Sequence, residues 1–202
     1  SSVLPDTTMA AEGATHTNFV FGGTDVASNE AFVCYAIELS GWGGRSFADG
    51  NDATDSINGN CRVIPVEVFE TRFPLQCERF ELVQDSGGAG KNRGGLSTTR
   101  VIKSLSIDIT GSQMSDRHAT RPWGLYGGKS GGTAGTWFCA ANSLDWKGID
   151  VAFGKVSPSK WSNVTISPGD SIRFQTPGGG GWGDPMDRER ERVAEDLAEG
   201  YI

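Results

Sequence analysis

The residues whose types could do chemistry gather in one stretch, in which Asp85, Ser86, Lys91 and Arg93 alternate with glycines. An arginine such as Arg93 can bind a carboxylate or a phosphate through two parallel N–H groups, and Asp85 could orient it. The same two side chains could instead tie the loop to its own sheet. The sequence leaves both interpretations open.

Two familiar motifs fail in this stretch. A phosphate-binding P-loop requires Ser or Thr directly after Gly-Lys, but Asn92 follows Lys91. A serine nucleophile at Ser86 requires a histidine base and a carboxylate that orients this base. The two histidines of the chain, His16 and His118, lie in no protease-like context.

A third motif occurs further along the chain, where residues 178–183 have the G-x-G-x-x-G spacing of a dinucleotide-binding loop. Asp184 would then place a carboxylate at the helix N-terminus, where a pyrophosphate should sit. No βαβ unit follows in the sequence. We therefore interpret this run as a flexible crossover from a strand to the last helix.

Metal binding requires clustered ligands, and the histidines do not supply them. His16 and His118 are far apart, and the acidic loop from Asp49 to Asp55 lacks the glutamate of a calcium-binding loop. No metal site is therefore expected in this chain. His118, next to Arg117 in a long polar loop, is the better functional candidate of the two histidines, against the alternative of a packing or surface histidine.

Composition bounds the class of protein. The 202 residues carry a net charge of −7 and include 29 glycines. An acidic chain with scattered basic residues argues against nucleic-acid binding, and no apolar stretch is long enough to span a membrane. The cysteines follow no zinc-binding spacing and are expected to be buried free thiols in a cytoplasmic protein: Cys34, Cys61, Cys77 and Cys139.

The pattern of apolar residues predicts a mainly β fold, either a sandwich or a barrel-like domain of about eight or nine short strands with long glycine-rich loops. The segments predicted to be strands are 18–21, 31–39, 62–70, 80–84, 100–109, 136–141, 150–153, 164–166 and 171–175. The whole chain, residues 1–202, is expected to form a single domain.

One helix is predicted, over residues 185–199. Asp184 is its expected N-cap, Pro185 takes the first helical position and Gly200 ends it. An apolar stripe that includes Val193 and Leu197 should pack on the body of the protein, and the arginines opposite should face solvent.

The stretch from Glu78 to Leu96, taken whole, resembles the hydantoinase B family through its D-S-G-G-A-G-x-x-R-G-G-L run. Four further segments agree with that family and occur in its order: 41–50, 60–70, 122–128 and 176–185. The family includes B-type subunits of ATP-dependent N-methylhydantoinases and the matching part of 5-oxoprolinases. The resemblance covers nearly the whole chain and implies the C-terminal domain of a longer subunit.

The resemblance implies a role in opening cyclic amides such as hydantoins and 5-oxoproline. ATP would be bound by a partner A-type subunit, and a divalent metal would belong to the N-terminal part of the B-type subunit. The implied partners are a hydantoinase A-like subunit, the remainder of the B-type subunit and a small cyclic-amide substrate. Low-ranked catalytic candidates are Asp85, Arg93, Arg117 and His118. Candidates for lining a pocket or an interface are Trp42, Arg45, Asp49, Trp123 and Trp182.

Two alternatives remain open at this level. A similar subunit occurs in ATP-dependent carboxylases that act on acetone or acetophenone, and nothing in the residues separates the two reactions. A non-catalytic β-sandwich binding module would instead be expected to show tryptophans on a strand face or in a groove. Three of the six tryptophans, Trp42, Trp123 and Trp182, lie beside glycines, which favours loops.

Overall fold

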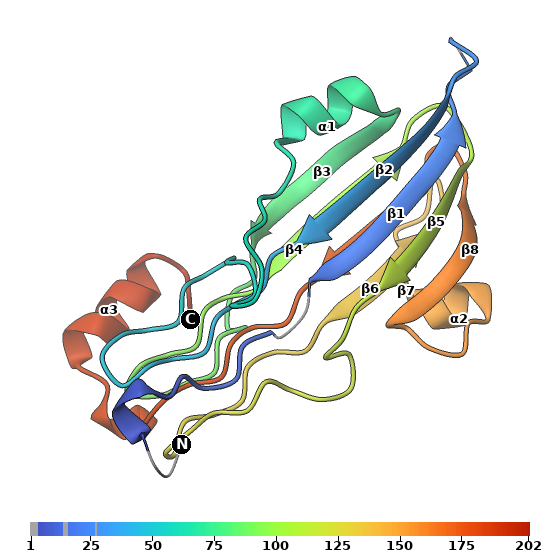
Figure 1. The fold of residues 1–202 in the computed structure, drawn as a ribbon. Coiled ribbons are helices and arrows are strands. Elements are labelled where there is room, and N and C mark those ends of the chain that lie inside the picture. Colours follow the sequence, from blue (N-terminus) through green and yellow to red (C-terminus); the bar gives the residue numbers. More distant parts are fainter. Residues whose placement is uncertain (1–3, 14–15, 27) are drawn as a thin grey trace.

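The computed structural model describes residues 4–13, 16–26 and 28–202. The described chain forms two antiparallel sheets packed face to face, with long irregular segments gathered at one end (Figure 1). The predicted β class is confirmed as a sandwich, because neither sheet closes into a barrel. None of the helices in the described chain is long and apolar enough to cross a membrane.

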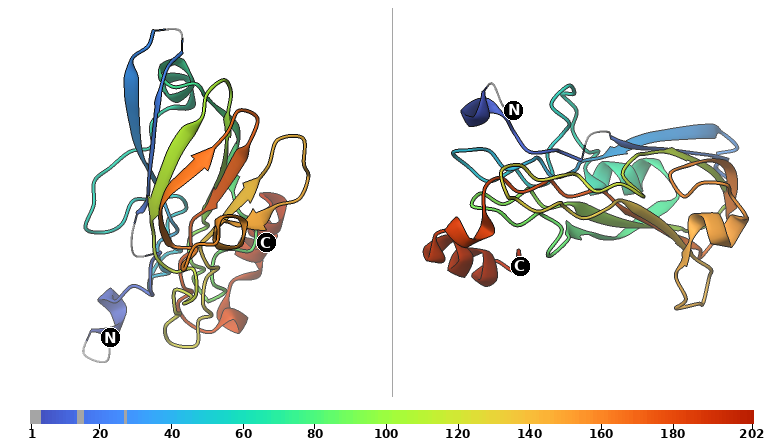
Figure 2. Two further views of the ribbon diagram at one scale, coloured as in Figure 1. Left: turned by 90° about the vertical axis from the view of Figure 1, so that its right-hand side faces the viewer. Right: turned by 90° about the horizontal axis from the view of Figure 1, so that it is seen from below.

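The first sheet has the strand order β2-β1-β5-β8 and the second has the order β3-β4-β9-β6-β7. The strands of the first sheet are β1 (Thr17–Thr24), β2 (Ala31–Glu38), β5 (Ile109–Met114) and β8 (Lys160–Ile166). The strands of the second sheet are β3 (Leu75–Leu82), β4 (Thr98–Ser104), β6 (Gly135–Cys139), β7 (Lys147–Gly148) and β9 (Ser171–Gln175). Figure 2 shows the two layers from the side, with the chain crossing repeatedly between them.

The core lies between the sheets because alternate residues of each strand point inward. Phe19 of β1 stacks on Phe174 of β9, with ring centroids 4.2 Å apart and planes 4° from parallel. Phe21, Ile109 and Ile172 are also buried in this cluster. The aromatic stack therefore joins the two sheets directly.

One ion pair is buried inside this sandwich. Nη1 of Arg100 in β4 lies 3.0 Å from Oε1 of Glu38 in β2, and both side chains are 1% exposed. The Arg100 guanidinium also lies 4.3 Å from the ring centroid of Phe80. Burial raises the pKa of Glu38 to about 7, although the charge of Arg100 acts in the opposite direction.

Three segments differ from the strands that the sequence predicts. Residues 62–70 contain α1 (Val66–Arg72), because Pro65 begins a helix whose Phe69 is buried in the core. Residues 150–153 lie in α2 (Ile149–Phe153), which ends at Gly154 in a left-handed conformation. Residues 100–109 contain the end of β4 and, after a turn, the first residue of β5, and these two strands belong to different sheets. In the first two segments the apolar alternation is real, but burial on one side does not require a strand.

The C-terminal helix is also shorter than predicted. A 3-10 turn, η2 (Pro185–Asp187), is capped by Asp184, whose carboxylate accepts from the Met186 N–H at 2.9 Å. The helix α3 (Arg190–Ala198) follows, and Gly200 has a φ of +71° after it. The predicted apolar stripe is wrong, since Leu197 is 60% exposed. Charged residues hold this helix in place instead, as described below.

Candidate functional site

The candidate residues lie at the end of the molecule where the irregular segments gather. The segment 176–183 runs through the middle of this region, and its successive glycines bond to different neighbours. Gly179, Gly180 and Gly181 donate their N–H groups to the carbonyls of Gly95, Ala11 and Lys129, respectively. Their own carbonyls accept from Gly88, Gly44 and Leu125, respectively. We call this set of backbone-bonded segments the glycine bundle: residues 10–13, 40–51, 86–96, 122–132 and 176–183.

The glycines of this bundle are required by close approach of backbone to backbone. A Cβ atom on Gly179 would overlap the Trp42 carbonyl, and one on Gly178 would overlap the Ser86 carbonyl. The structure shows that these glycines contact other segments of their own chain, so they form part of a rigid internal scaffold.

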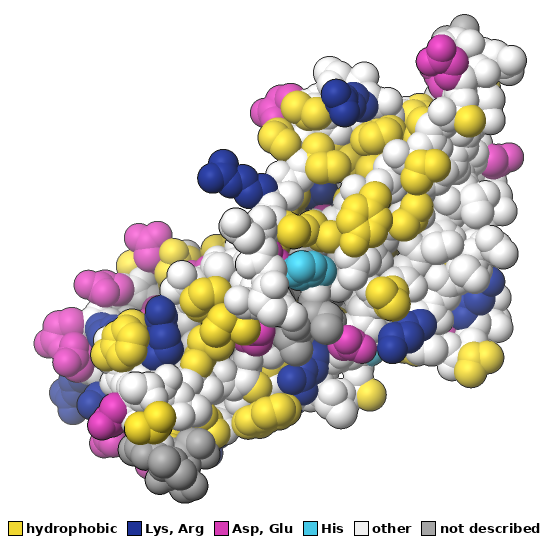
Figure 3. Space-filling view, viewed as in Figure 1, with side chains coloured by type: hydrophobic (Ala, Val, Ile, Leu, Met, Phe, Trp, Pro, Cys, Tyr) yellow, Lys and Arg dark blue, Asp and Glu magenta, His cyan; other side chains and the backbone are white. Residues whose placement is uncertain are grey.

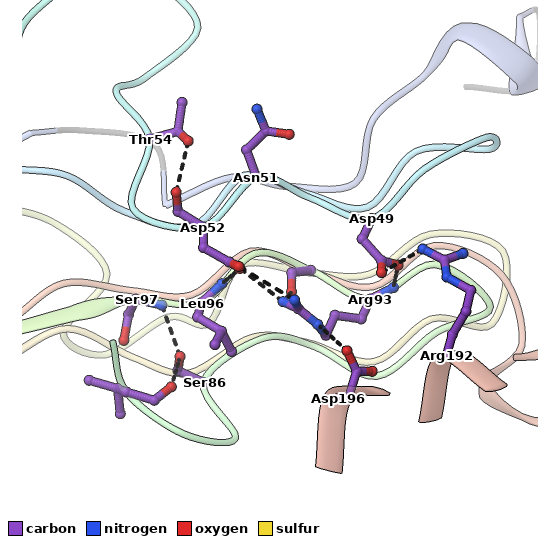
Figure 4. A network of polar contacts seen from close by, with 12 residues as sticks. Asp49, Asn51, Asp52, Thr54, Ser86, Arg93, Leu96, Ser97, Arg192 and Asp196 are labelled. Atoms are coloured by element: carbon purple, nitrogen blue, oxygen red, sulfur yellow. Dashed lines mark hydrogen bonds and ion pairs between the residues drawn. The ribbon is translucent and has the colours of Figure 1, made fainter. Parts of the chain in front are cut away.

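An arginine–aspartate network fastens the helix α3 to this bundle (Figure 4). Arg93 donates to Asp52 at 2.9 Å and to Asp196 of α3 at 3.3 Å, and its side chain is 8% exposed. The guanidinium carbon of Arg93 also lies 4.8 Å from the ring centroid of Tyr201. All of these partners belong to the protein itself. They support a structural role for Arg93 over the binding of a ligand carboxylate or phosphate.

Two further arginines extend the network to Asp49. Arg188 donates to Asp49 at 2.9 Å and to Asp196 at 2.6 Å, and Arg192 forms an ion pair with Asp49 at 2.6 Å. Burial alone would raise the pKa of Asp49, but the hydrogen bond and charge of Arg188 and the charge of Arg192 outweigh it, so this pKa lies below its ordinary value. Asp49 is thus ionised at neutral pH and joins the loop 40–55 to the C-terminal helix.

Asp85 does not orient Arg93. Its backbone N–H donates to the Tyr201 carbonyl at 3.0 Å, and its φ is +58°. Ser86 is buried, and its Oγ accepts from the Ser97 N–H at 2.9 Å. Ser86 therefore has a structural role in the turn, in agreement with the rejection of a protease site.

His118 and Arg117 lie on another loop and do not meet the arginine–aspartate network through any contact in the described chain. The Oγ of Ser115 is 2.8 Å from Nε2 of His118. Burial lowers the pKa of His118, against the opposing charges of Asp116 and Asp150. The imidazole is therefore neutral at neutral pH. Its bond to Ser115 fits a packing role more closely than a catalytic one.

The candidate tryptophans and Arg45 have different surroundings. Trp42 donates its indole N–H to the Asp55 carbonyl, so its ring anchors a loop. Trp123 is 56% exposed, and the Arg117 guanidinium lies 4.9 Å from its ring centroid. Arg45 donates to the Asp49 carbonyl at 2.7 Å. Among these residues, only Trp123 presents a large exposed ring.

Trp182 lies within the glycine bundle. Its backbone exchanges two hydrogen bonds with Asn92, at 2.8 and 3.0 Å, and its ring lies 5.3 Å from that of Tyr126. These contacts anchor the end of the glycine run. They place Trp182 within the scaffold that the candidate loops share.

Sequence reasoning missed Asp52, Asp196, Arg188 and Arg192 as partners of Arg93 and Asp49. The arginines were expected to lie on a solvated helix face, but Arg188 has only 8% of its side chain exposed. The sequence offers only a weak signal for these contacts. A 3-10 turn that ends before α3 lets Arg188 and Asp196 meet, although they are eight residues apart. Local helix spacing does not predict that contact.

The described residues contain no group of three or more His, Cys, Asp or Glu side chains placed to hold a metal ion. The cysteines are free in the described structure; Cys34 and Cys139 are buried as expected, but Cys61 is exposed, contrary to expectation. Hydrophobic side chains gather on the surface over β2 and α1 (Figure 3). The exposed members of this surface include Val33, Tyr35 and Val68. A surface of this kind is typical of an interface with further polypeptide.

Comparison with known proteins gives these features a context. The family model described as hydantoinase B/oxoprolinase matches residues 1–185. A protein of Pseudomonas sp. strain NS671, named as the B-type subunit of a D-/L-hydantoinase, is 34% identical over 87% of this chain and 28% of its own length. The 5-oxoprolinase of Dictyostelium discoideum is 31% identical over 82% of this chain and 12% of its own length. The chain thus spans less than a third of these two relatives.

Two solved structures share the fold. A nucleotide-free acetone carboxylase structure matches 92% of this chain and 28% of its own chain, with a TM-score of 0.74 and 24% identity. An ATP-dependent caprolactamase from Pseudomonas jessenii matches 96% of this chain and 33% of its own, with a TM-score of 0.76 and 22% identity. At these identities the likeness concerns the fold.

Proposed function

Because the chain belongs to the hydantoinase B/oxoprolinase family, we propose that it is the C-terminal domain of the B-type subunit of an ATP-dependent enzyme that opens cyclic amides such as hydantoin or 5-oxoproline. The observation that carries the proposal is the family match over residues 1–185. The relatives named as part of a hydantoinase and as a 5-oxoprolinase support this substrate class.

In this proposal the chain is a scaffold that shapes a site completed by other polypeptides. The glycine bundle is rigid because its glycines are packed against neighbouring backbone. The arginine–aspartate network fixes α3 against the bundle and leaves Arg93 no free hydrogen-bonding edge for a substrate among the contacts described above. The exposed loop around Trp123 is then the better candidate for the surface that faces the site.

The proposed partners follow from the same argument. A hydantoinase A-like subunit would bind ATP and activate the amide carbonyl, and the remainder of the B-type subunit would supply the metal ligands and the groups that complete ring opening. Such a complex would be cytoplasmic, where ATP is present. The apolar surface over β2 and α1 offers a place for neighbouring polypeptide (Figure 3).

The likeness to the acetone carboxylase structure favours one alternative, in which the same subunit serves a carboxylase. Both reactions would use ATP to activate an oxygen of the substrate. They differ in the second reactant, since ring opening consumes water whereas carboxylation consumes bicarbonate. The assay must therefore include both reactants.

The test is reconstitution. The chain would be co-expressed with an A-type subunit and the remainder of a B-type subunit, and ATP hydrolysis would be measured with 5-oxoproline, with hydantoin, and with acetone plus bicarbonate. We expect amide-dependent ATP hydrolysis by the full set and none by this chain alone. Turnover by this chain alone, or full activity of the complex without it, would contradict the scaffold role. Activity only with acetone and bicarbonate would establish the alternative.

A further inference from the structure

A row of side chains crosses the outer face of the five-stranded sheet. Arg79 of β3 pairs with Val101 of β4, Val101 pairs with Arg173 of β9, and Arg173 pairs with Trp137 of β6. The neighbouring residues Ile102, Ile172 and Phe174 are buried in the core. Since side chains alternate along a strand, this row must point away from the core.

Arg173 lies close to two indole rings, that of Trp137 in this row and that of Trp146, which directly precedes β7. Its guanidinium carbon is 4.2 Å from the ring centroid of Trp137 and 5.2 Å from that of Trp146. Both distances are within the range of cation–π attraction. These contacts restrain the guanidinium, and its N–H groups remain the polar part of the side chain.

Among the described residues, the Arg173 side chain has no hydrogen-bond or ion-pair partner. Its Nε is buried without a hydrogen-bond acceptor among the described residues. The nearby carboxylate of Glu78 is already engaged, since it accepts from the Ser171 hydroxyl at 3.1 Å and pairs with Lys103 at 3.5 Å. A buried donor without an acceptor destabilises the fold. Because Nε is shielded from solvent, an acceptor from outside the described chain would meet the Nη groups of Arg173, which are not among the buried atoms.

A cavity of about 260 Å³ opens at this point and is lined by Glu78, Arg79, Val101, Trp146 and Arg173. Two of its lining residues are arginines. One of them, Arg79, already forms a surface ion pair, since its guanidinium lies 3.3 Å from the carboxylate of Glu81. Burial and the charge of Arg79 both lower the pKa of Arg173. Arg173 is thus the one lining arginine without a paired carboxylate among the described residues, and Trp146 and Val101 form an apolar wall beside it.

We propose that this cavity, which we call the Arg173 cavity, binds the carboxylate of a small planar organic acid. The carboxylate would accept the N–H groups of Arg173, which are pre-oriented for a bidentate pair. The planar body would lie against the Trp146 indole, and Arg79 would add long-range attraction. This proposal goes beyond the cyclic-amide reaction and does not depend on it.

The test is a titration of this chain with benzoate, followed by NMR of the tryptophan indole N–H groups. Trp146→Phe identifies the Trp146 signal. We expect saturable shifts of the Trp146 and Trp137 signals with benzoate. Benzyl alcohol, which has the same ring without the charge, should cause at least ten-fold weaker effects, and so should sodium chloride at equal ionic strength.

Variants locate the binding to Arg173. Arg173→Gln should weaken benzoate binding at least ten-fold, and Arg173→Lys should weaken it less because it keeps the charge but loses the planar fork. Arg190→Gln, which removes an exposed arginine of α3, is the matched control and should leave binding unchanged. If Arg173→Gln does not fold by circular dichroism, Arg79→Gln on the exposed strand β3 replaces it and should weaken binding by a smaller factor.

Several results would overturn the proposal. They are the absence of any saturable benzoate shift, equal binding of benzoate by wild type and Arg173→Gln, and equal shifts with benzyl alcohol. Inorganic phosphate that binds as tightly as benzoate would also overturn it, because that result would indicate a general anion site without preference for a planar carboxylate. None of these outcomes depends on ATP or on the reconstituted complex, so the proposed function stands or falls separately.

Discussion

The β-sandwich and the glycine bundle occupy opposite ends of the molecule and are stabilised in different ways (Figure 1). The sandwich is stabilised by burial of large side chains, such as the stacked rings of Phe19 and Phe174. The glycine bundle is stabilised by backbone hydrogen bonds between segments that glycine allows to approach closely. Removing side-chain volume should therefore harm the first region, whereas adding a single methyl group should harm the second.

The two regions also differ in the surroundings and the pKa of their buried carboxylates. Glu38 in the sandwich is buried with one cation, and its pKa is raised to about 7. Asp49 in the arginine–aspartate network is met by Arg188 and Arg192, and its pKa is lowered. A carboxylate in the core is thus hard to ionise, whereas a carboxylate at the bundle surface with several donors is hard to protonate.

The largest expected effect is that of Gly179→Ala in the glycine bundle. The new methyl group would overlap the Trp42 carbonyl, and backbone on both sides prevents relaxation. We expect a loss of about 4 kcal/mol or more in the free energy of unfolding, measured by urea denaturation.

The matched control for that change is Gly22→Ala in strand β1. The nearest atom to its Cβ would be the Phe32 carbonyl oxygen at 3.5 Å, an ordinary van der Waals distance. We expect this variant to change stability by less than about 1 kcal/mol. Equal losses in both variants would show that the glycine bundle is no more tightly packed than a strand.

The second prediction concerns Glu38 and pH. The folded protein binds a proton at Glu38 at pH values where the unfolded chain has released it, so stability should fall as pH rises from about 4.5 to about 7 and then level off. In Glu38→Gln this fall should be reduced, by an amount on the order of 1–3 kcal/mol over that range. Urea denaturation at a series of pH values measures it. An unchanged slope in the variant would place the titrating group elsewhere.

The smallest expected effect is that of Asp49→Asn. The variant keeps one oxygen acceptor but loses the charge that pairs with Arg188 and Arg192, so we expect a loss of about 1–2 kcal/mol at pH 7. Because the pKa of Asp49 is lowered in the folded state, its contribution in the wild type should be present above the ordinary carboxyl pKa and be lost as pH falls through the lower folded value. A variant effect of the same size at pH 2 and pH 7 would contradict this assignment.

Much of the fold could be predicted from local patterns. The strand segments 31–39, 136–141 and 171–175 overlap β2, β6 and β9 of the structure. The segments 62–70 and 150–153 could not be assigned correctly, because an apolar residue every second position is compatible with a short helix that buries one side chain. Phe69 and Ile149 are these buried side chains, and only the sheets beside them define their burial.

The candidate site was less accessible to sequence reasoning. Arg93 was identified, but its partner Asp52 is 41 residues away and Asp196 is 103 residues away. Arg79, Arg173 and Trp137 come from strands whose order in the sheet does not follow the sequence, and Trp146 directly precedes β7. Contacts at such separations depend on strand register, which no local spacing encodes.

The sequence by itself determined the β class, the hydantoinase B resemblance and the places where glycine is needed, because alternation, motif and residue type are local properties. Only the tertiary structure decided what those glycines touch and which charges meet. A glycine permits close approach without specifying the neighbour, and a charged side chain acquires its partner and its pKa from segments that folding brings beside it.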